Sequence, residues 1–344
     1  MRDLARHHDV ALQQLRASAA AATGEELPDI VPLRRVRPRD VLTTAAIIFA
    51  AYLLISKLAK IGFGTIYHEL RASNLVWVAV ALIVAQLSYV SEAVQLRGAV
   101  ETPLPLLPCV VLKSAAKFLN LTVPGSAGSI ALGIRFLQRL GVPTGEAVAA
   151  GMVDDFTASI VQLLLFVSLI KFVHFHFDTS NLSGAVPSKT FVAVVVVAVA
   201  AAVIVVLAVP RLRNKVLPSA RDAVRSTWTV VRDRRKRLDL FGGAIATEVI
   251  FALALGASAS AYGVHLSLAQ LLLVNVGVTM LAGLIPVPGG IGAAEAGLAA
   301  GLVAMGVPEA TAFAIAITHR LCTYYLPPVW GYFSLEWLRR KGNV

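Results

Sequence analysis

Charged side chains are scarce in this sequence. Only 15% of its 344 residues are Asp, Glu, Lys or Arg, whereas 57% are hydrophobic, and the mean hydropathy is +0.74. A soluble domain carries about 25% charged residues, so this composition excludes an ordinary soluble protein. Apolar runs of roughly 20 residues recur along the chain, which is the length that crosses a ~30 Å hydrocarbon core. The sequence therefore predicts an all-α, polytopic membrane protein.

Cysteine is rare as well, and the familiar catalytic motifs are missing. Cys109 and Cys322 both lie in apolar segments, where a small buried side chain is the usual role, so we expect neither a disulfide nor a metal site. The sequence has no P-loop, no HExxH motif and no GxGxxG motif followed by an acid. The longest hydrophilic insertion, residues 210–239, is too short for a soluble catalytic domain. We therefore expect no enzymatic activity, no catalytic residues and no cofactor.

Eight apolar runs are long enough to predict membrane spans. Two further runs, residues 126–140 and 290–305, are only 15 and 16 residues long, or about 23 Å as helices, which is short of a full crossing. Each follows a Pro-Gly pair, and such breakers at membrane depth predict re-entrant helices that begin inside the protein. The eight predicted spans are residues 41–59, 75–94, 104–122, 146–170, 190–209, 240–262, 268–285 and 311–335.

Positive charge indicates the sides of the membrane. The formal net charge is +11, and basic residues are densest at residues 210–239, a loop that we expect on the cytoplasmic face against anionic lipid headgroups rather than against nucleic acid. Residues 1–40 form a polar tail without the apolar core of a signal peptide, and residues 339–344 are also basic. Both termini are therefore expected in the cytoplasm, with a multi-pass domain over residues 41–338 in the cell inner membrane.

These sides agree with the number of spans only if two segments turn back within the membrane. Residues 104–140 and 268–305 must each enter and leave on one face, and the two faces are opposite. That arrangement is typical of inverted-topology repeats, which place a site near the bilayer midplane. A weak internal similarity supports repeats over about residues 104–172 and 268–335. The matching motifs are VPGSAG (123–128) with VPGGIG (287–292), and GVP (141–143) with GVP (306–308).

Nine ionisable side chains lie inside the apolar runs. Charges are costly within a membrane, so these residues are candidates for function. A structural ion pair, or snorkelling of a long side chain to the interface, would also explain them. Glu248 lies near the start of its span, where an interfacial position is the commoner reason. The nine residues are Glu92, Lys113, Lys117, Asp154, Asp155, Glu248, Glu295, His319 and Arg320.

The site predicted from these residues holds a lipid phosphate. Lys113 and Lys117 are four residues apart and share a helix face, and Arg320 would add a third cation. Short helices that begin at mid-depth would direct unpaired N–H groups at the same anion. The carboxylates would pair with these cations or with a cationic headgroup, and Glu295 could instead satisfy backbone donors. The predicted substrate-binding residues are Lys113, Lys117, Pro124, Gly125, Asp154, Asp155, Pro288, Gly289, Gly290, Glu295, His319 and Arg320.

The segment VPGGIGAAEAGLAAGLVAMGVPEATAFAIAITHRLCTYYLP (287–327) resembles the lysylphosphatidylglycerol synthase transmembrane, or flippase-like, domain. This domain is the membrane region of multiple peptide resistance factors, and it also occurs in stand-alone relatives. Residues 117–143 resemble its first-half segment more loosely, and the resemblance covers roughly residues 40–338. It implies movement of lipids with charged or glycosylated headgroups between leaflets. Lipid synthesis belongs to a separate cytoplasmic domain of the family, so we expect no synthase activity here.

The chain departs from the family pattern in two places. Ser126 and Ser129 stand where the family leads us to expect a basic residue and an acid, and Asp154 and Asp155 stand in place of an acid–Arg pair. An altered headgroup preference or a changed ion coupling would follow. Two alternatives to a lipid translocator stay open: a proton-coupled secondary transporter of a small anion, and a membrane scaffold for a lipid-modifying enzyme or a glycosyltransferase. Self-association into a homo-oligomer is compatible with each reading.

Overall fold

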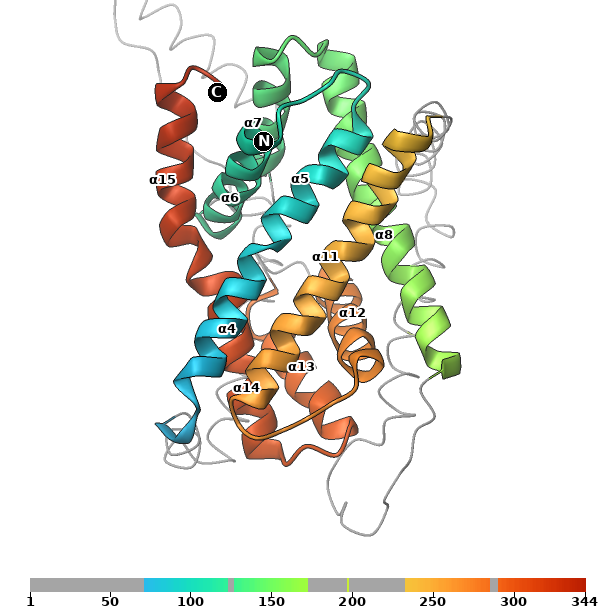
Figure 1. The fold of residues 1–344 in the computed structure, drawn as a ribbon, viewed down its shortest axis with the longest axis vertical. Helices are drawn as coiled ribbons and strands as arrows, with labels where there is room; N and C mark the ends of the chain where they lie inside the picture. Colours follow the sequence, from blue (N-terminus) through green and yellow to red (C-terminus); the bar gives the residue numbers. More distant parts are fainter. Residues whose placement is uncertain (1–70, 123–126, 173–196, 198–232, 285–289) are drawn as a thin grey trace, which may run out of the picture. The chain divides into compact units, whose positions relative to one another are not determined.

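The computed structural model describes five parts of the chain: residues 71–122, 127–172, 197, 233–284 and 290–344. All of them belong to the second of two compact units, residues 43–344. Every regular element in these described ranges is a helix, and none is a strand (Figure 1). Several predictions lie outside these ranges: the polar tail 1–40, the spans 41–59 and 190–209, and residues 210–232 of the basic loop.

Three long apolar helices could cross a membrane by length and composition in the described part of the chain. The first joins α4 (Leu75–Gln86) to α5 (Ser88–Ala99) with only Leu87 between them. The others are α8 (Thr144–Phe172) and α11 (Arg234–Ser260). These helices coincide with three of the predicted spans and confirm a helical membrane protein.

Four shorter helices form two adjacent pairs. In the first half, α6 (Leu106–Thr122) packs against α7 (Ala127–Arg139), and in the second half α12 (Leu268–Leu284) packs against α13 (Ala293–Ala304). α7 and α13 have 13 and 12 residues, or about 20 Å of helix at most, which is less than the hydrocarbon core requires. The two short runs of the sequence are therefore short helices, each packed on the helix before it.

The C-terminal region differs from the single span predicted at residues 311–335. It consists of α14 (Glu309–Arg320), a π-helical turn (Leu321–Tyr325) and α15 (Pro327–Arg340). A proline ring clashes with the carbonyl four residues earlier and has no N–H to donate, so Pro327 and Pro328 cannot continue an α-helix. The π-helical turn absorbs the break by widening the last helical turn before the prolines. α14 packs against α13 and α11, whereas α15 packs against α6.

The N-terminal end of α11 also differs from prediction, because the basic stretch up to residue 239 is partly helical. Asp233 caps the helix, and its carboxylate accepts the backbone N–H of Arg235 at 2.8 Å. Lys236 donates from Nζ to the backbone carbonyls of Arg97 and Val100, at 3.1 and 2.5 Å. A cation at the C-terminal end of α5 is favourable because the last carbonyls of a helix are negative. At least one cation of the predicted loop therefore joins two helices.

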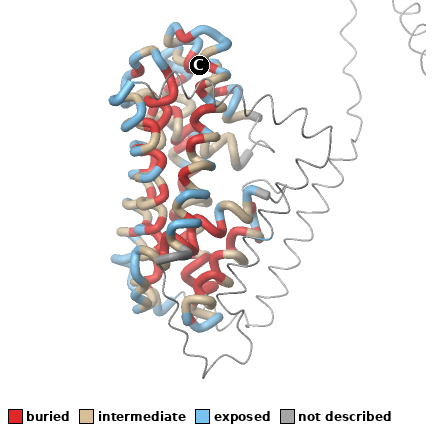
Figure 2. The backbone as a smooth tube through the Cα atoms, turned by 90° about the vertical axis from the view of Figure 1, so that its right-hand side faces the viewer, coloured by how far each residue is buried: buried red, intermediate tan, exposed pale blue. Residues whose placement is uncertain are grey.

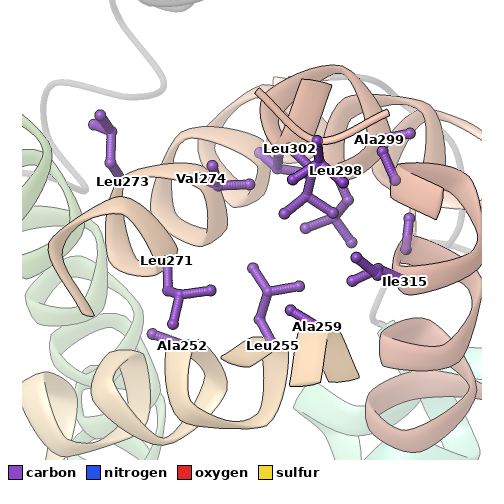
Figure 3. Close-up of a cluster of buried hydrophobic side chains, with 14 of the residues drawn as sticks. Ala252, Leu255, Ala259, Leu271, Leu273, Val274, Leu298, Ala299, Leu302 and Ile315 are labelled. Atoms are coloured by element: carbon purple, nitrogen blue, oxygen red, sulfur yellow. The ribbon is translucent and has the colours of Figure 1, made fainter. Parts of the chain in front are cut away.

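Two apolar clusters lie at different ends of α11. Its first turns contribute Leu240 to a cluster with α5, α6, α7 and α8, and its last turns contribute Leu255 and Ala259 to a cluster with α12, α13 and α14. In the second cluster, Leu255, Leu271, Leu298 and Ile315 converge from four helices (Figure 3). Buried residues occur along the whole length of the helices rather than at one end (Figure 2). The two larger packing centres of the described helices are thus joined by one long helix, and a smaller third cluster lies around Ala81, Ala257 and Cys322.

Glycines allow α5 and α11 to approach closely at the first of these clusters. A Cβ added to Gly98 would collide with the backbone of Leu240, and one added to Gly243 would lie 2.6 Å from the backbone nitrogen of Gln95. Small residues at a helix crossing permit this backbone contact in membrane proteins. The close approach brings polar residues of α5 next to polar residues of α11: Ser91 Oγ and Thr247 Oγ1 are 2.7 Å apart.

Candidate functional site

The first buried ion pair joins α6 to α8. Lys113 Nζ lies 2.6 Å from Asp154 Oδ2, and the two side chains are 18% and 11% exposed. Gln95 of α5 donates its side-chain amide to the backbone carbonyl of Asp154 at 2.9 Å, which adds a third helix. Asp154 Oδ1 is buried and makes no hydrogen bond of good geometry among the described residues, and the neighbouring Gln95 amide also acts on this carboxylate. This pair therefore has one carboxylate oxygen with unused acceptor capacity.

The second lysine of α6 pairs with a different helix. Lys117 Nζ lies 2.8 Å from Glu92 Oε1 on α5, and its charge is about 6 Å from the rings of Tyr89 and Phe251. Ring faces attract cations at this distance. Lys113 and Lys117 share a helix face, as predicted, but each has its own carboxylate. Glu92 is one of the nine intramembrane ionisable residues but not one of the predicted substrate-binding residues, and its contact with Lys117 places it next to them.

The second half of the chain holds its ion pair at the start of α13. Gly292, at φ 83°, precedes the helix, a backbone conformation that favours glycine. Glu295 Oε2 accepts the Gly292 N–H at 2.6 Å, as a helix-capping acid three residues into a helix does. Glu295 Oε1 accepts Arg320 Nε at 2.9 Å and the Tyr325 hydroxyl at 2.6 Å. Both alternatives considered for Glu295 therefore hold: it pairs with Arg320 and it satisfies a backbone donor.

Aromatic rings complete the surroundings of Arg320. Its guanidinium carbon lies 4.2 Å from the ring centre of Tyr324 and 5.7 Å from that of Tyr325. Both tyrosines belong to the π-helical turn, whose hydrogen bonds run from residue i to residue i+5. That turn brings Tyr325, five residues after Arg320, to the same carboxylate as Arg320. The sequence offered no signal for this, because residues five apart lie on different faces of an α-helix.

Other predicted site residues are not in these pairs. Asp155 is exposed on α8. His319 is only 3% exposed, its Nδ1 has no hydrogen-bond partner in the described ranges, and it contacts the backbone of Ala254 on α11. Gly290 is buried at φ 61°, as expected for a turn before α13. Pro124, Gly125, Pro288 and Gly289 lie outside the described residues.

Glu248 is buried between α11 and its neighbours α8 and α12. It is 6% exposed and accepts the side-chain amides of Gln162 on α8 and Asn275 on α12. Neither amide was predicted, because a single Gln or Asn in an apolar run is a weak signal. Glu248 does not belong to a metal-binding cluster either: no group of three or more His, Cys, Asp and Glu side chains that could hold a metal occurs among the described residues.

These features define a helical membrane domain in which charged side chains are held in pairs between helices. Residues 41–331 match the family described as the lysylphosphatidylglycerol synthase TM region. The match covers well over half of the chain, so the protein belongs to this family, as the resemblance over residues 40–338 indicated. No curated protein matched the chain.

Proposed function

We propose that the protein is a lipid translocator, which moves a phospholipid or lipid-linked intermediate with a charged headgroup between leaflets without changing it chemically. Membership of a family of membrane domains supports this proposal. The observation that carries it is the pair Lys113–Asp154, which is buried between helices yet retains a carboxylate oxygen without a partner among the described residues. Ion pairs of this kind in membrane domains often belong to a substrate pathway.

In the proposed mechanism, a lipid phosphate replaces Asp154 as the partner of Lys113. An ammonium donates to a phosphate as readily as to a carboxylate, because both acceptors are ionised. The displaced Asp154 can then accept from a cationic headgroup, such as an aminoacyl group, so that charge stays balanced inside the protein. Apolar tails would remain in the bilayer. The exchange costs little because one ion pair is replaced by another rather than broken.

The two short-helix pairs, α6–α7 and α12–α13, would act as re-entrant units of opposite orientation. Their lengths and their positions in the two sequence repeats support this arrangement. Each unit contributes one residue to a buried ion pair with the helix that follows it. In the first ion pair the cation lies on α6 and the acid on α8, whereas in the second the acid lies on α13 and the cation on α14, so the order of the two charges along the chain is reversed. Inverted repeats with a central site are a common design of transporters that alternate between two faces.

The test is reconstitution of the full chain into liposomes that carry fluorescent lipids with anionic, zwitterionic and aminoacylated headgroups. We expect faster movement between leaflets than in empty liposomes for at least one headgroup. Lys113→Gln should abolish most of this gain, and Lys341→Gln, at an exposed C-terminal lysine, should leave it unchanged. Equal rates with and without protein for every headgroup would overturn the proposal. Uptake of a soluble anion by the same vesicles would support the transporter alternative instead.

A further inference from the structure

Glu248 differs from the other buried carboxylates because neutral groups hold it. Its Oε1 accepts Gln162 Nε2 at 2.8 Å, and its Oε2 accepts Asn275 Nδ2 at 3.1 Å. These contacts connect α11 to α8 on one side and to α12 on the other. No cation is paired with Glu248 among the described residues, whereas Glu92, Asp154 and Glu295 each have one.

The charges around Glu248 do not compensate it. Glu92 on α5 adds a second negative charge that acts on it, and Glu92 is itself held by Lys117. The helices α4 and α12, which also pack on α11, contain no charged side chain. On α8, Asp154 lies eight residues before Gln162, or about 12 Å along the helix, and it is paired with Lys113.

The remaining neighbour of α11, α14, brings no cation to Glu248. Arg320 is bound to Glu295. His319 contacts the backbone of Ala254, which is six residues beyond Glu248 and thus about 9 Å further along α11. A buried carboxylate without a cation strongly favours uptake of a positive charge, because burial penalises its ionised form.

The amide partners suit a proton better than a metal ion. A hard metal ion such as Ca²⁺ or Mg²⁺ needs about six or more oxygen ligands, whereas a carboxylate and two side-chain amides offer at most about four oxygens in any rotation. Glu248 also belongs to no group of three or more metal-ligating side chains among the described residues. Each amide carries both a donor and an acceptor, so a rotated Gln162 or Asn275 can accept the hydrogen of a protonated Glu248. The same three side chains can therefore hold either form, with different hydrogen bonds between α8, α11 and α12.

The position of Glu248 on α11 connects a change in its hydrogen bonds to the packing of the other described helices. Glu248 lies on α11 between Leu240, in one apolar cluster, and Leu255, in the other, about 12 and 10 Å from them along the helix. The preceding residue, Thr247, bonds to Ser91 on α5. A change at Glu248 therefore acts where the helices of both halves meet.

We propose that Glu248 is a proton-binding site and that its protonation couples lipid movement to a transmembrane proton gradient. The coupling rests on the function proposed above, whereas the proton site does not. Proton uptake would neutralise Glu248, reverse one of its two amide hydrogen bonds and shift the packing of α8 or α12 on α11. No atom other than the proton is transferred, and the proton is released to the other side when the packing reverts.

The first test does not depend on lipid movement. Infrared difference spectra of the full chain in nanodiscs, taken between about pH 4 and about pH 9, should show the carbonyl band of a buried, protonated carboxyl group. Glu248→Gln should remove this band, and Glu101→Gln, at an exposed residue, should retain it. In Gln162→Leu the band should move to higher frequency, because a hydrogen bond to the carboxyl group is lost. A spectrum that does not change in Glu248→Gln would overturn the proton site, because other buried carboxyl groups such as Asp154 can contribute bands of their own.

The second test addresses coupling in lipid-containing vesicles with a pH step across the membrane. We expect the step to accelerate lipid movement several-fold in wild type and in Glu101→Gln, and to have no effect in Glu248→Gln. If wild type moves lipid but ignores the pH step, coupling is wrong while the translocator stands. If the infrared band behaves as expected but wild type moves no lipid, the proton site stands, and both the translocator and its coupling are overturned.

Discussion

Two buried ion pairs in the described part of the molecule use the same chemistry differently. Lys113–Asp154 has one donor on one carboxylate oxygen and leaves the other oxygen without a partner in the described structure. Arg320–Glu295 uses both oxygens, which accept a backbone N–H, a guanidinium and a tyrosine hydroxyl. The side chains of Lys113 and Asp154 are 18% and 11% exposed, whereas those of Arg320 and Glu295 are 13% and 4% exposed. The second pair is therefore the more enclosed of the two.

This difference in hydrogen bonding indicates a different role for each pair: one can exchange its ionic partner, and the other supports the local structure. A carboxylate that is held by one cationic donor loses only that contact when its cation moves to a phosphate, and a cationic headgroup can then take the place of the lysine. A carboxylate that holds a helix start, a cation and a hydroxyl at once loses all three if it moves. We therefore assign lipid contact mainly to the Lys113–Asp154 pair, and positioning of the α13 turn mainly to Arg320–Glu295.

The largest effect is expected from Glu295→Ala. This substitution removes the acceptor of three donors and leaves Arg320 buried without this carboxylate, so the free energy of unfolding should fall by about 3–5 kcal/mol. Thermal unfolding of the purified protein in detergent measures it. Arg340→Ala, which breaks an exposed ion pair with Glu336, is the control and should change stability by at most about 1 kcal/mol. Similar losses for both variants would contradict a supporting role for Glu295.

The next effect is expected from Asp154→Leu, which leaves Lys113 buried without its partner. The pair is more exposed than Arg320–Glu295, so the loss of stability should be smaller, at about 2–3 kcal/mol. Adding Lys113→Met should restore most of the stability, because an apolar pair of similar volume replaces the ion pair. Lipid movement should stay low in the double variant. Restored lipid movement there would show that the ion pair is only structural.

Tyr325→Phe tests the contribution of the π-helical turn to the more enclosed pair. It removes one hydrogen bond to a charged group, so stability should fall by about 1.5–2 kcal/mol. Tyr332→Phe, at an exposed tyrosine of α15, is the matched control. Unfolding curves of the two variants should separate clearly. Coinciding curves would mean that the hydroxyl of Tyr325 contributes nothing to holding Glu295.

The smallest effect is expected from Asp155→Asn. This residue is adjacent to Asp154 but is exposed on α8 and joins none of the ion pairs of the described residues, and Asn has nearly the same size. The free energy of unfolding should therefore stay within about 0.5 kcal/mol of wild type, and lipid movement should stay near the wild-type rate. Asp154→Asn in the same vesicles should reduce lipid movement strongly. A strong loss in Asp155→Asn would place the headgroup on the exposed side of α8, and would end the distinction between the two aspartates.

Local sequence was enough to predict the elements near these sites. The apolar run at 75–94 became the α4–α5 helix, and the Pro-Gly pairs preceded the short helices α7 and α13. The four-residue spacing of Lys113 and Lys117 correctly placed them on one face of α6. Such features depend on residues within one or two turns, which interact whatever the rest of the chain does.

Membrane helicity, the short helices and the choice of charged candidates were thus determined by the sequence alone, because hydrophobic length and helical period act locally. Tertiary structure alone decided the partners: Lys113 reaches Asp154, Lys117 reaches Glu92, and Glu248 meets two amides from α8 and α12. The physical reason is that a buried charge takes whichever partner helix packing brings within about 3 Å. That packing depends on close contacts, such as Gly243 against α5, between segments far apart in the chain.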